Sequence, residues 1–224
     1  LLSEPELRRP LAARRLALAA HPASVTARLQ HSLDALAAIP ELRLSAAFGP
    51  QHGLRGDKQD NMIESPDFND PVHGIPVFSL YGNVRKPTGE MMDTFDVILV
   101  DLQDLGCRIY TFVTTLRYVL EAASQHHKTV WVLDRPNPVG RPVEGLTLRE
   151  GWQSFVGAGP LPMRHGLTLG ELGVEDGVVR SAFSLGSPVI AEIERAGPSA
   201  RRWAGEGRVP IGVTPTLGTS RWWR

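Results

Sequence analysis

Phe95-Asp96-Val97-Ile98-Leu99-Val100-Asp101 and Thr129-Val130-Trp131-Val132-Leu133-Asp134 are the two stretches of sequence that decide the fold. Each is a nearly continuous apolar run that ends in an aspartate. Between them, residues 111–126 have the pattern of an amphipathic helix, with Leu116 and Leu120 on one face. Apolar strands that alternate with amphipathic helices are typical of a parallel sheet covered on both faces. We therefore predict an α/β fold, a Rossmann-like open parallel sheet with helices on both faces.

Three further strands and three further helices are predicted along residues 1–173. The predicted strands are residues 15–20, 42–48 and 76–81. The first predicted helix is capped by Ser24 or Thr26 and has apolar residues at helical spacing, namely Leu29, Leu33, Leu36 and Ile39. A second, short helix is capped by Thr88 and runs through Met92. A third helix begins within residues 168–172. Residues 51–74 are polar and lack periodicity, and a stretch of this length is expected to be a functional or disordered loop.

The composition excludes several classes of protein. The chain of 224 residues has 24 basic and 24 acidic side chains, and a strongly basic nucleic-acid binder is therefore not expected. Its one cysteine, Cys107, permits no internal disulfide and no cysteine metal cluster. No apolar run is long enough for a membrane-spanning helix. The sequence shows no signal segment, which favours a cytoplasmic location, or a periplasmic or extracellular one if the N-terminus is missing.

Two regions of different character are expected. Residues 1–173 carry the alternating strand and helix patterns and are expected to form a catalytic-type domain. Residues 174–224 lose this pattern, and they carry seven basic and five acidic side chains and three of the five tryptophans. We expect this second region to be a divergent tail, the product of a truncated or frame-shifted C-terminal region.

Polar side chains gather where four of the predicted strands end, beginning at His21, Gly49, Asp101 and Asp134. Ligands of open α/β sheets bind outside the carboxyl ends of the strands, so we expect a ligand site there, with ordinary solvated loops as the alternative. The sequence contains no G-x-G-x-x-G, no G-x-x-x-x-G-K-[ST] and no G-x-S-x-G motif. Dinucleotide binding, nucleoside triphosphate binding and ordinary serine-hydrolase chemistry are therefore disfavoured.

Acidic side chains are the remaining chemical resource. They are Glu64, Asp101, Asp104, Asp134, Glu144 and Glu171. Each also has a structural interpretation: Asp104 could pair with Arg108 four residues on, and Asp134 could bond backbone amides in a rigid turn. Taken together, the acidic groups fit a carboxylate-driven hydrolysis of a polar substrate such as a sugar.

Seven ordered blocks across residues 16–173 resemble one known family. They are residues 48–57 (FGPQHGLRGD), 76–82 (PVFSLYG) with 86–88 (KPT), 100–111 (VDLQDLGCRIYT), 133–138 (LDRPNP), 143–145 (VEG), 154–157 (SFVG) and 164–172 (RHGLTLGEL). The chain resembles the NamZ-like family, also known as DUF1343. Its characterised members are exo-β-N-acetylmuramidases, which remove N-acetylmuramic acid from the non-reducing ends of peptidoglycan fragments during cell-wall recycling.

The resemblance implies a glycosidase with no cofactor and no metal, and a second, smaller domain that closes one side of the cleft. The implied substrate is a muropeptide sugar, with no nucleic-acid or membrane partner. Gln51 stands where the family has a glutamate, so Glu64 is the preferred general acid, with Asp101 or Asp104 to stabilise charge or activate water. The side chains expected to bind the sugar and its lactyl carboxylate are Gln51, His52, Arg55, Arg108, Tyr110, Asp134, Asn137 and His165.

Two alternatives are open at this point. Gln51 and the divergent tail are also compatible with a non-catalytic muropeptide-binding protein or an inactive remnant. A metal-dependent hydrolase built on Asp101, Asp104 and His52 is the third interpretation.

Overall fold

A computed structural model of the chain describes residues 1–56, 64–175, 181–183 and 189–192. In chain order the strands are β1 (Arg15–Ala20), β2 (Arg43–Gly49), β3 (Phe68–Asn69), β4 (Pro76–Ser79), β5 (Val97–Asp101), β6 (Thr129–Asp134), β7 (Ser181–Phe183) and β8 (Val189–Glu192). The helices are α1 (Pro5–Arg8), a 3-10 turn at Arg9–Leu11, α2 (Ser32–Ala37), α3 (Gly89–Met92), α4 (Phe112–Gln125) and α5 (Leu169–Glu175). No helix within these ranges is both long enough and apolar enough to cross a membrane.

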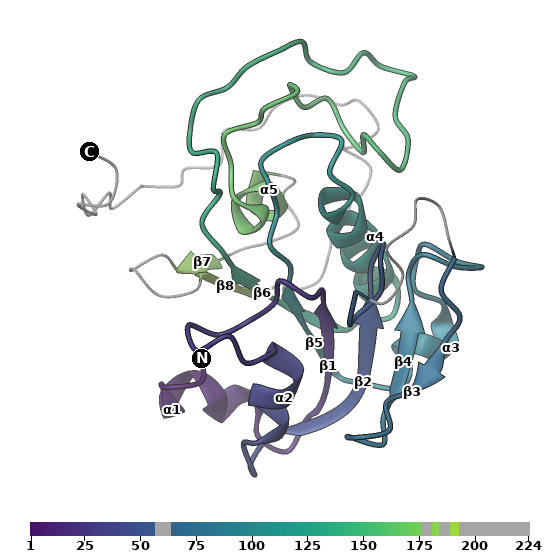
Figure 1. Cartoon of the computed structure of the whole chain (residues 1–224), viewed down its shortest axis with the longest axis vertical. Coiled ribbons are helices and arrows are strands. Elements are labelled where there is room, and N and C mark those ends of the chain that lie inside the picture. Colours follow the sequence, from purple (N-terminus) through teal and green to yellow (C-terminus); the bar gives the residue numbers. More distant parts are fainter. Residues whose placement is uncertain (57–63, 176–180, 184–188, 193–224) are drawn as a thin grey trace.

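The described strands form a single sheet in the order β3-β4-β2-β1-β5-β6-β8-β7 (Figure 1). The five inner strands from β4 to β6 pair in parallel, whereas β3 pairs antiparallel with β4, and β8 pairs antiparallel with both β6 and β7. The chain runs outward from β1 through β2 to β4, then returns to the other side of β1 to form β5. The predicted Rossmann-like parallel sheet is confirmed for the inner strands, and the boundary between β1 and β5 is its topological switch point.

Helices cover both faces of the sheet, as predicted. On one face α3, α4 and α5 pack over a cluster that includes Phe48, Ile98 and Leu116. On the other face the 3-10 turn and α2 contribute Leu11, Leu33 and Leu36 to a second cluster. The strands feed both clusters because alternate residues point to opposite faces, which explains why the sequence of β5 is apolar at nearly every position.

The helix expected to begin near Ser24 starts later, at Ser32, and this prediction is wrong in its first turns. Ser24 and Thr26 make other bonds: Ser24 Oγ donates to the carbonyl of Asp101, and Thr26 Oγ1 accepts from the backbone of Arg28 and Gln30. Leu29, counted as part of the apolar face, is 81% exposed. The side chain of His31 caps α2 instead, by accepting from the backbone N–H of Leu33 at 3.3 Å. Ser24 and Thr26 therefore stabilise turns and do not cap a helix, a role that short polar side chains equally allow.

The polar stretch 51–74 is not wholly without structure, because it contains β3. The carboxylate of Asp70 accepts hydrogen bonds from the backbone N–H groups of Val72 and His73 at 3.0 and 2.9 Å. The backbone N–H of Asp70 in turn donates to the carbonyl of Ile75. This turn reverses the chain into β4, and a strand of two residues is too short to produce a periodic pattern in the sequence.

Phe48 tests the packing of the first face. It is fully buried, and its ring centroid lies 5.3 Å from that of Phe78 and 5.8 Å from that of Phe95. We expect Phe48→Ala to lower the free energy of unfolding by about 3–5 kcal/mol in urea denaturation, because a cavity would replace the ring. Leu146→Ala, at a side chain that is 85% exposed, should change it by less than about 0.5 kcal/mol. Equal losses in the two variants would contradict this description of the core.

Candidate functional site

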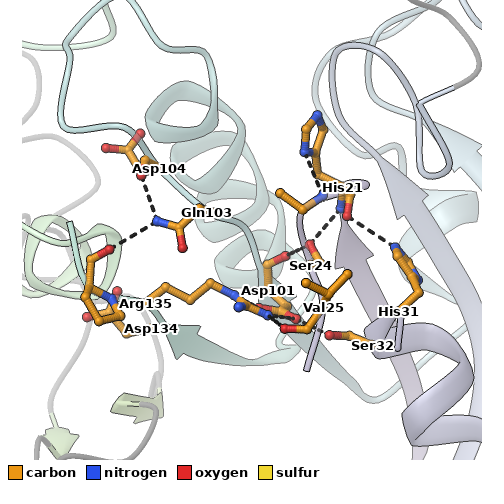
Figure 2. Close-up of polar contacts among 12 residues, drawn as sticks. His21, Ser24, Val25, His31, Ser32, Asp101, Gln103, Asp104, Asp134 and Arg135 are labelled. Carbon is orange, nitrogen blue, oxygen red and sulfur yellow. Dashed lines mark hydrogen bonds and ion pairs between the residues drawn. The ribbon is translucent and has the colours of Figure 1, made fainter. Parts of the chain in front are cut away.

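The carboxyl ends of the parallel strands meet at one edge of the sheet, where the connecting loops carry most of the residues expected to act on a ligand. Figure 2 shows the middle of this edge, where the ends of β1, β5 and β6 meet α2. The long loop between β6 and α5, residues 135–168, forms the upper part of the view in Figure 1. We describe this edge as the candidate site, strand by strand.

Asp101 ends β5 and is nearly completely buried, at 2% exposed. Arg135, just after β6, forms a two-pronged ion pair with it, Nε to Oδ1 at 2.6 Å and a terminal nitrogen to Oδ2 at 2.9 Å. Ser32 of α2 donates to Oδ2 as well (Figure 2). Both carboxylate oxygens are thus bonded to the protein. This arrangement suits a residue that positions its neighbours, and it does not suit a catalytic acid or base.

Asp104 lies in the loop after β5 and is also buried, at 4% exposed. Its Oδ2 accepts from the backbone N–H of Gly106 at 2.7 Å and lies 3.3 Å from Nε2 of His165. His165 Nδ1 accepts from the N–H of Leu167, so in its neutral form the ring carries its proton on Nε2, toward Asp104. Oδ1 of Asp104 is buried and has no hydrogen-bond partner among the described residues. A buried carboxylate oxygen without a partner is costly, and an external donor would relieve that cost.

A row of three rings crosses the switch point. The His21 ring meets Phe112 edge-on at 4.9 Å between centroids, and Tyr110 meets Phe112 edge-on at 4.7 Å. Burial, and to a lesser extent the nearby His52 and His31, lowers the pKa of His21 to about 4, so its imidazole is neutral at pH 7. Burial, together with the charge of Asp104, raises the pKa of Tyr110. The sequence places His21 at the end of a predicted strand but does not single it out as a site residue.

Asp134 ends β6 and anchors the start of α5. Its Oδ1 accepts from the N–H of Gly170 at 2.7 Å, and its Oδ2 accepts from the hydroxyl of Thr168 at 2.5 Å. Thr168 and Glu171 also bond each other's backbone N–H groups, which is a capping box. Burial raises the pKa of Asp134 to about 6. The structure thus gives Asp134 the role of a helix cap.

Asn137 and Arg108, both expected to bind substrate, hold loops together. The Asn137 amide donates to the carbonyl of Leu167 at 3.0 Å, and its oxygen accepts from the N–H of Val139. One terminal nitrogen of Arg108 donates to the carbonyls of Leu146 and Leu161, at 2.8 and 2.7 Å. Arg108 therefore bonds backbone carbonyls, in place of the ion pair with Asp104 that the spacing of four suggested.

The loop after β2 carries Gln51, His52 and Arg55. Gln51 Oε1 accepts from the hydroxyl of Thr111 at 3.1 Å, which ties this loop to the start of α4. His52 adopts a positive φ of 72°. Arg55 turns to the opposite side, where Asp34 at 3.2 Å and Asp70 at 3.3 Å bind its guanidinium. This pairing raises the pKa of Arg55 and lowers that of Asp34, as expected of a structural ion-pair network.

Glu64 is exposed and makes no hydrogen bond or ion pair with another described residue. The N–H of its neighbour Ser65 donates to the carbonyl of Tyr81 at 3.1 Å, so Glu64 lies beside the end of β4. Two strands, β2 and β1, separate β4 from β5, so the axes of β4 and β5 are about 14 Å apart. Glu64 therefore lies at a different end of the candidate site from Asp101, the residue that ends β5.

No group of three or more histidine, cysteine, aspartate or glutamate side chains is arranged to hold a metal ion in the part of the chain that the structure describes. The metal-dependent interpretation of Asp101, Asp104 and His52 gains no support from these side chains, because both oxygens of Asp101 are already bonded within the protein.

Comparisons with known proteins agree with the fold and with the seven sequence blocks. Residues 16–175 match the family model described as exo-beta-N-acetylmuramidase NamZ, N-terminal. The chain is similar to peptidoglycan beta-N-acetylmuramidase NamZ of Bacillus subtilis (strain 168), with 43% identity over 169 residues, which are 75% of this chain and 41% of that protein.

Two solved structures of DUF1343 family proteins from Bacteroides fragilis NCTC 9343 have the same fold. The first has a TM-score of 0.69 and 40% identity, over 76% of this chain and 43% of that one. The second has a TM-score of 0.66 and 32% identity, over 79% of this chain and 46% of that one. The chain thus spans less than half of the length of each of these three relatives.

The Asp101–Arg135 pair gives a first test of the site's architecture. We expect Arg135→Met to lower the free energy of unfolding in urea by about 3–5 kcal/mol, because it leaves a buried carboxylate without its cation. Asp101→Asn in the Arg135→Met background should recover part of this loss, since the unpaired charge is then gone. A loss below about 1 kcal/mol in Arg135→Met would show that the pair does not hold the edge together.

Asp134 gives a second test, through pH. Because the pKa of Asp134 is about 6 in the folded chain against an ordinary value of 3.8, the folded state binds more protons than the unfolded state between these pH values. Its contribution to stability is therefore most favourable below pH 4 and is lost as the pH rises through about 6. Asp134→Asn should remove this component, on the order of 3 kcal/mol between pH 4 and pH 7. The free energy of unfolding is measured at pH 4 and at pH 7 for both chains. An equal change between the two pH values in the variant and in the original chain would contradict the assignment of this component to Asp134.

Proposed function

The chain belongs to the family of NamZ N-terminal domains, and from this premise we propose that it is the catalytic-type domain of an exo-β-N-acetylmuramidase. The substrate is a peptidoglycan fragment with N-acetylmuramic acid at its non-reducing end, from which that sugar is released by hydrolysis. The observation that carries the proposal is the match of residues 16–175 to the family, because this range includes every strand end of the candidate site from β1 to β6.

Hydrolysis of a glycosidic bond requires a proton donor for the leaving oxygen and a second group that stabilises the developing positive charge or activates water. We propose Glu64 as the donor. Its support is its exposure, its lack of a partner among the described residues, and its place at the carboxyl edge of the sheet.

Asp104 is proposed as the second group. Its buried Oδ1 has no partner among the described residues. Its charge, after burial, contributes to the raised pKa of the nearby Tyr110. The N–H of Gly106 holds its other oxygen, which also lies 3.3 Å from Nε2 of His165, so the carboxylate is fixed before substrate arrives. Preorganisation of this kind lowers the cost of stabilising charge in the transition state.

Asp101 takes a positioning role in this proposal. Through Arg135 it bridges the loops after β1 and β6, because the same guanidinium also donates to the carbonyl of Val25 at 3.0 Å. Asp134 and Asn137 act in the same way on α5 and on the loop that carries His165.

Binding of muropeptide sugars without turnover is the second candidate, and the amide at Gln51 favours it. An amide cannot exchange a proton as a carboxyl group can, and the Gln51 oxygen is already bonded to Thr111. The two candidates differ in one observable, the release of free sugar.

We expect the chain to release N-acetylmuramic acid from the disaccharide MurNAc-GlcNAc, and Glu64→Gln to lower the rate at least 100-fold. Chromatography of the products measures this. The control is Glu6→Gln, at an exposed glutamate of α1 paired with Arg9, which should leave the rate unchanged. Release at the original rate from Glu64→Gln would refute the assignment of the acid, and binding of the disaccharide without release would favour the second candidate.

A further inference from the structure

Arg85 lies beyond the end of β4, with its guanidinium over two aromatic rings. Its guanidinium carbon lies 4.7 Å from the ring centroid of Tyr81 and 4.5 Å from that of Phe155. The two rings themselves are 5.8 Å apart and tilted by 36°. Arg85 therefore contacts both rings at once, although it is an exposed residue. A cation above aromatic faces is held electrostatically, and arginine also stacks with its plane on the ring.

Both rings are fixed by the fold. Tyr81 is 5% exposed, its N–H donates to the hydroxyl of Ser79 at 3.1 Å, and its carbonyl accepts from Ser65. The carbonyl of Phe155 accepts from the hydroxyl of Thr114 in α4 at 2.7 Å, and its ring stacks on Tyr118 at 6.4 Å. The guanidinium is thus held in place before any ligand binds, by Tyr81 just after β4 and by Phe155 in the loop between β6 and α5, which reduces the entropy lost on binding.

The hydrogen-bond donors of Arg85 are not used by the other described residues. An aromatic ring offers no oxygen acceptor, so a guanidinium held over two rings can still donate its N–H groups to an anion. Within the described residues no oxygen accepts a hydrogen bond from Arg85, whereas Arg55 and Arg108 are bonded to carboxylates and to carbonyls respectively. The two arginines selected from the sequence for the lactyl carboxylate are therefore occupied, whereas Arg85 has no hydrogen-bonded oxygen in the part of the chain that the structure describes.

The surroundings of Arg85 favour an anion. Its neighbour Lys86 lies 3.2 Å from Glu121 of α4, and Arg117 lies 2.9 Å from the same carboxylate. Two cations thus share one anion, and one of them, Lys86, directly follows Arg85; with Arg85 these side chains carry three positive charges and one negative charge. An anionic ligand is attracted to such a group, most strongly at low ionic strength.

We propose that Arg85 is the subsite for the carboxylate that distinguishes N-acetylmuramic acid from N-acetylglucosamine, an inference that rests on the proposed function. The two sugars differ only in the lactyl ether at O3 of muramic acid, which ends in this carboxylate. The ring of Tyr81 lies under Arg85, and its carbonyl accepts a hydrogen bond from the N–H of Ser65, the residue that follows Glu64. The proposed acid and the proposed carboxylate subsite thus meet at the end of β4, as one sugar ring that carries both the scissile bond and the lactyl group requires.

The experiment is titration calorimetry with three ligands: N-acetylmuramic acid, its methyl ester and N-acetylglucosamine. We expect the original chain to bind the free acid about 10- to 100-fold more tightly than either neutral sugar, the range of a charge-assisted arginine–carboxylate bond. Arg85→Gln should bind all three equally, with its affinity for the neutral sugars unchanged. Arg85→Lys should restore only part of the preference, because it keeps the charge and loses the two-pronged geometry.

The matched control is Arg43→Gln, an exposed arginine at the opposite, amino end of β2, which should keep the full preference for the acid. A preference for the acid that survives Arg85→Gln overturns the inference and leaves the proposed function standing, as does equal binding of the three ligands by the original chain. Failure of the original chain to bind any of these sugars overturns the proposed function, and the inference with it. Circular dichroism verifies that each variant is folded.

Discussion

The ion pair between Asp101 and Arg135 is the interaction on which the carboxyl edge of the sheet depends. Asp101 ends β5, Arg135 follows β6, Ser32 belongs to α2, and the carbonyls of Val25 and Asp101 receive further bonds from Arg135 and Ser24. Three segments far apart in the sequence, residues 24–32, the end of β5 and the start of the loop after β6, are thereby fixed around one buried carboxylate. Removing both charges from water is costly, and the two-pronged geometry with its additional hydroxyl bond offsets that cost. The ion pair gives the loops a defined geometry at the switch point. A loosely packed apolar contact would not fix their positions in this way.

Three aspartates at this edge show how surroundings assign roles to identical side chains. Asp101 faces an arginine and is bonded at both oxygens, whereas Asp104 lies beside a histidine and has one oxygen without a partner among the described side chains and backbone groups. Asp134 caps a helix, and its pKa is raised. A carboxylate that is fully bonded holds structure, and one with a spare oxygen can meet a ligand. Environment and not residue type therefore separates the groups that act from those that support.

The inner sheet was predictable from the sequence because a strand buried on both faces is apolar at almost every position, as β5 and β6 are. Elements that depend on a single side-chain hydrogen bond were not predictable. The start of α2, for example, depends on whether Ser24 caps a helix or bonds a carbonyl 77 residues away. The same distinction applies to the candidate site. Its place at the strand ends follows from topology, but the partners of Arg55, Arg108 and Arg85 are chosen through space. Arginine reaches far enough to select among several acceptors, so its position in the sequence does not determine which one it takes.

The place of β1 at the centre of the sheet has a consequence for how the chain folds. Its partner on one side, β2, follows within thirty residues, but its partner on the other side pairs Leu18 with Leu99, about eighty residues later. Contacts between such distant residues form slowly, because the intervening loop must be closed first. During synthesis on the ribosome, β1 therefore waits with one apolar edge unpaired until β5 emerges. That interval is when the chain is most exposed to edge-to-edge association, and the slow step of its folding is expected to be the closure of this central seam.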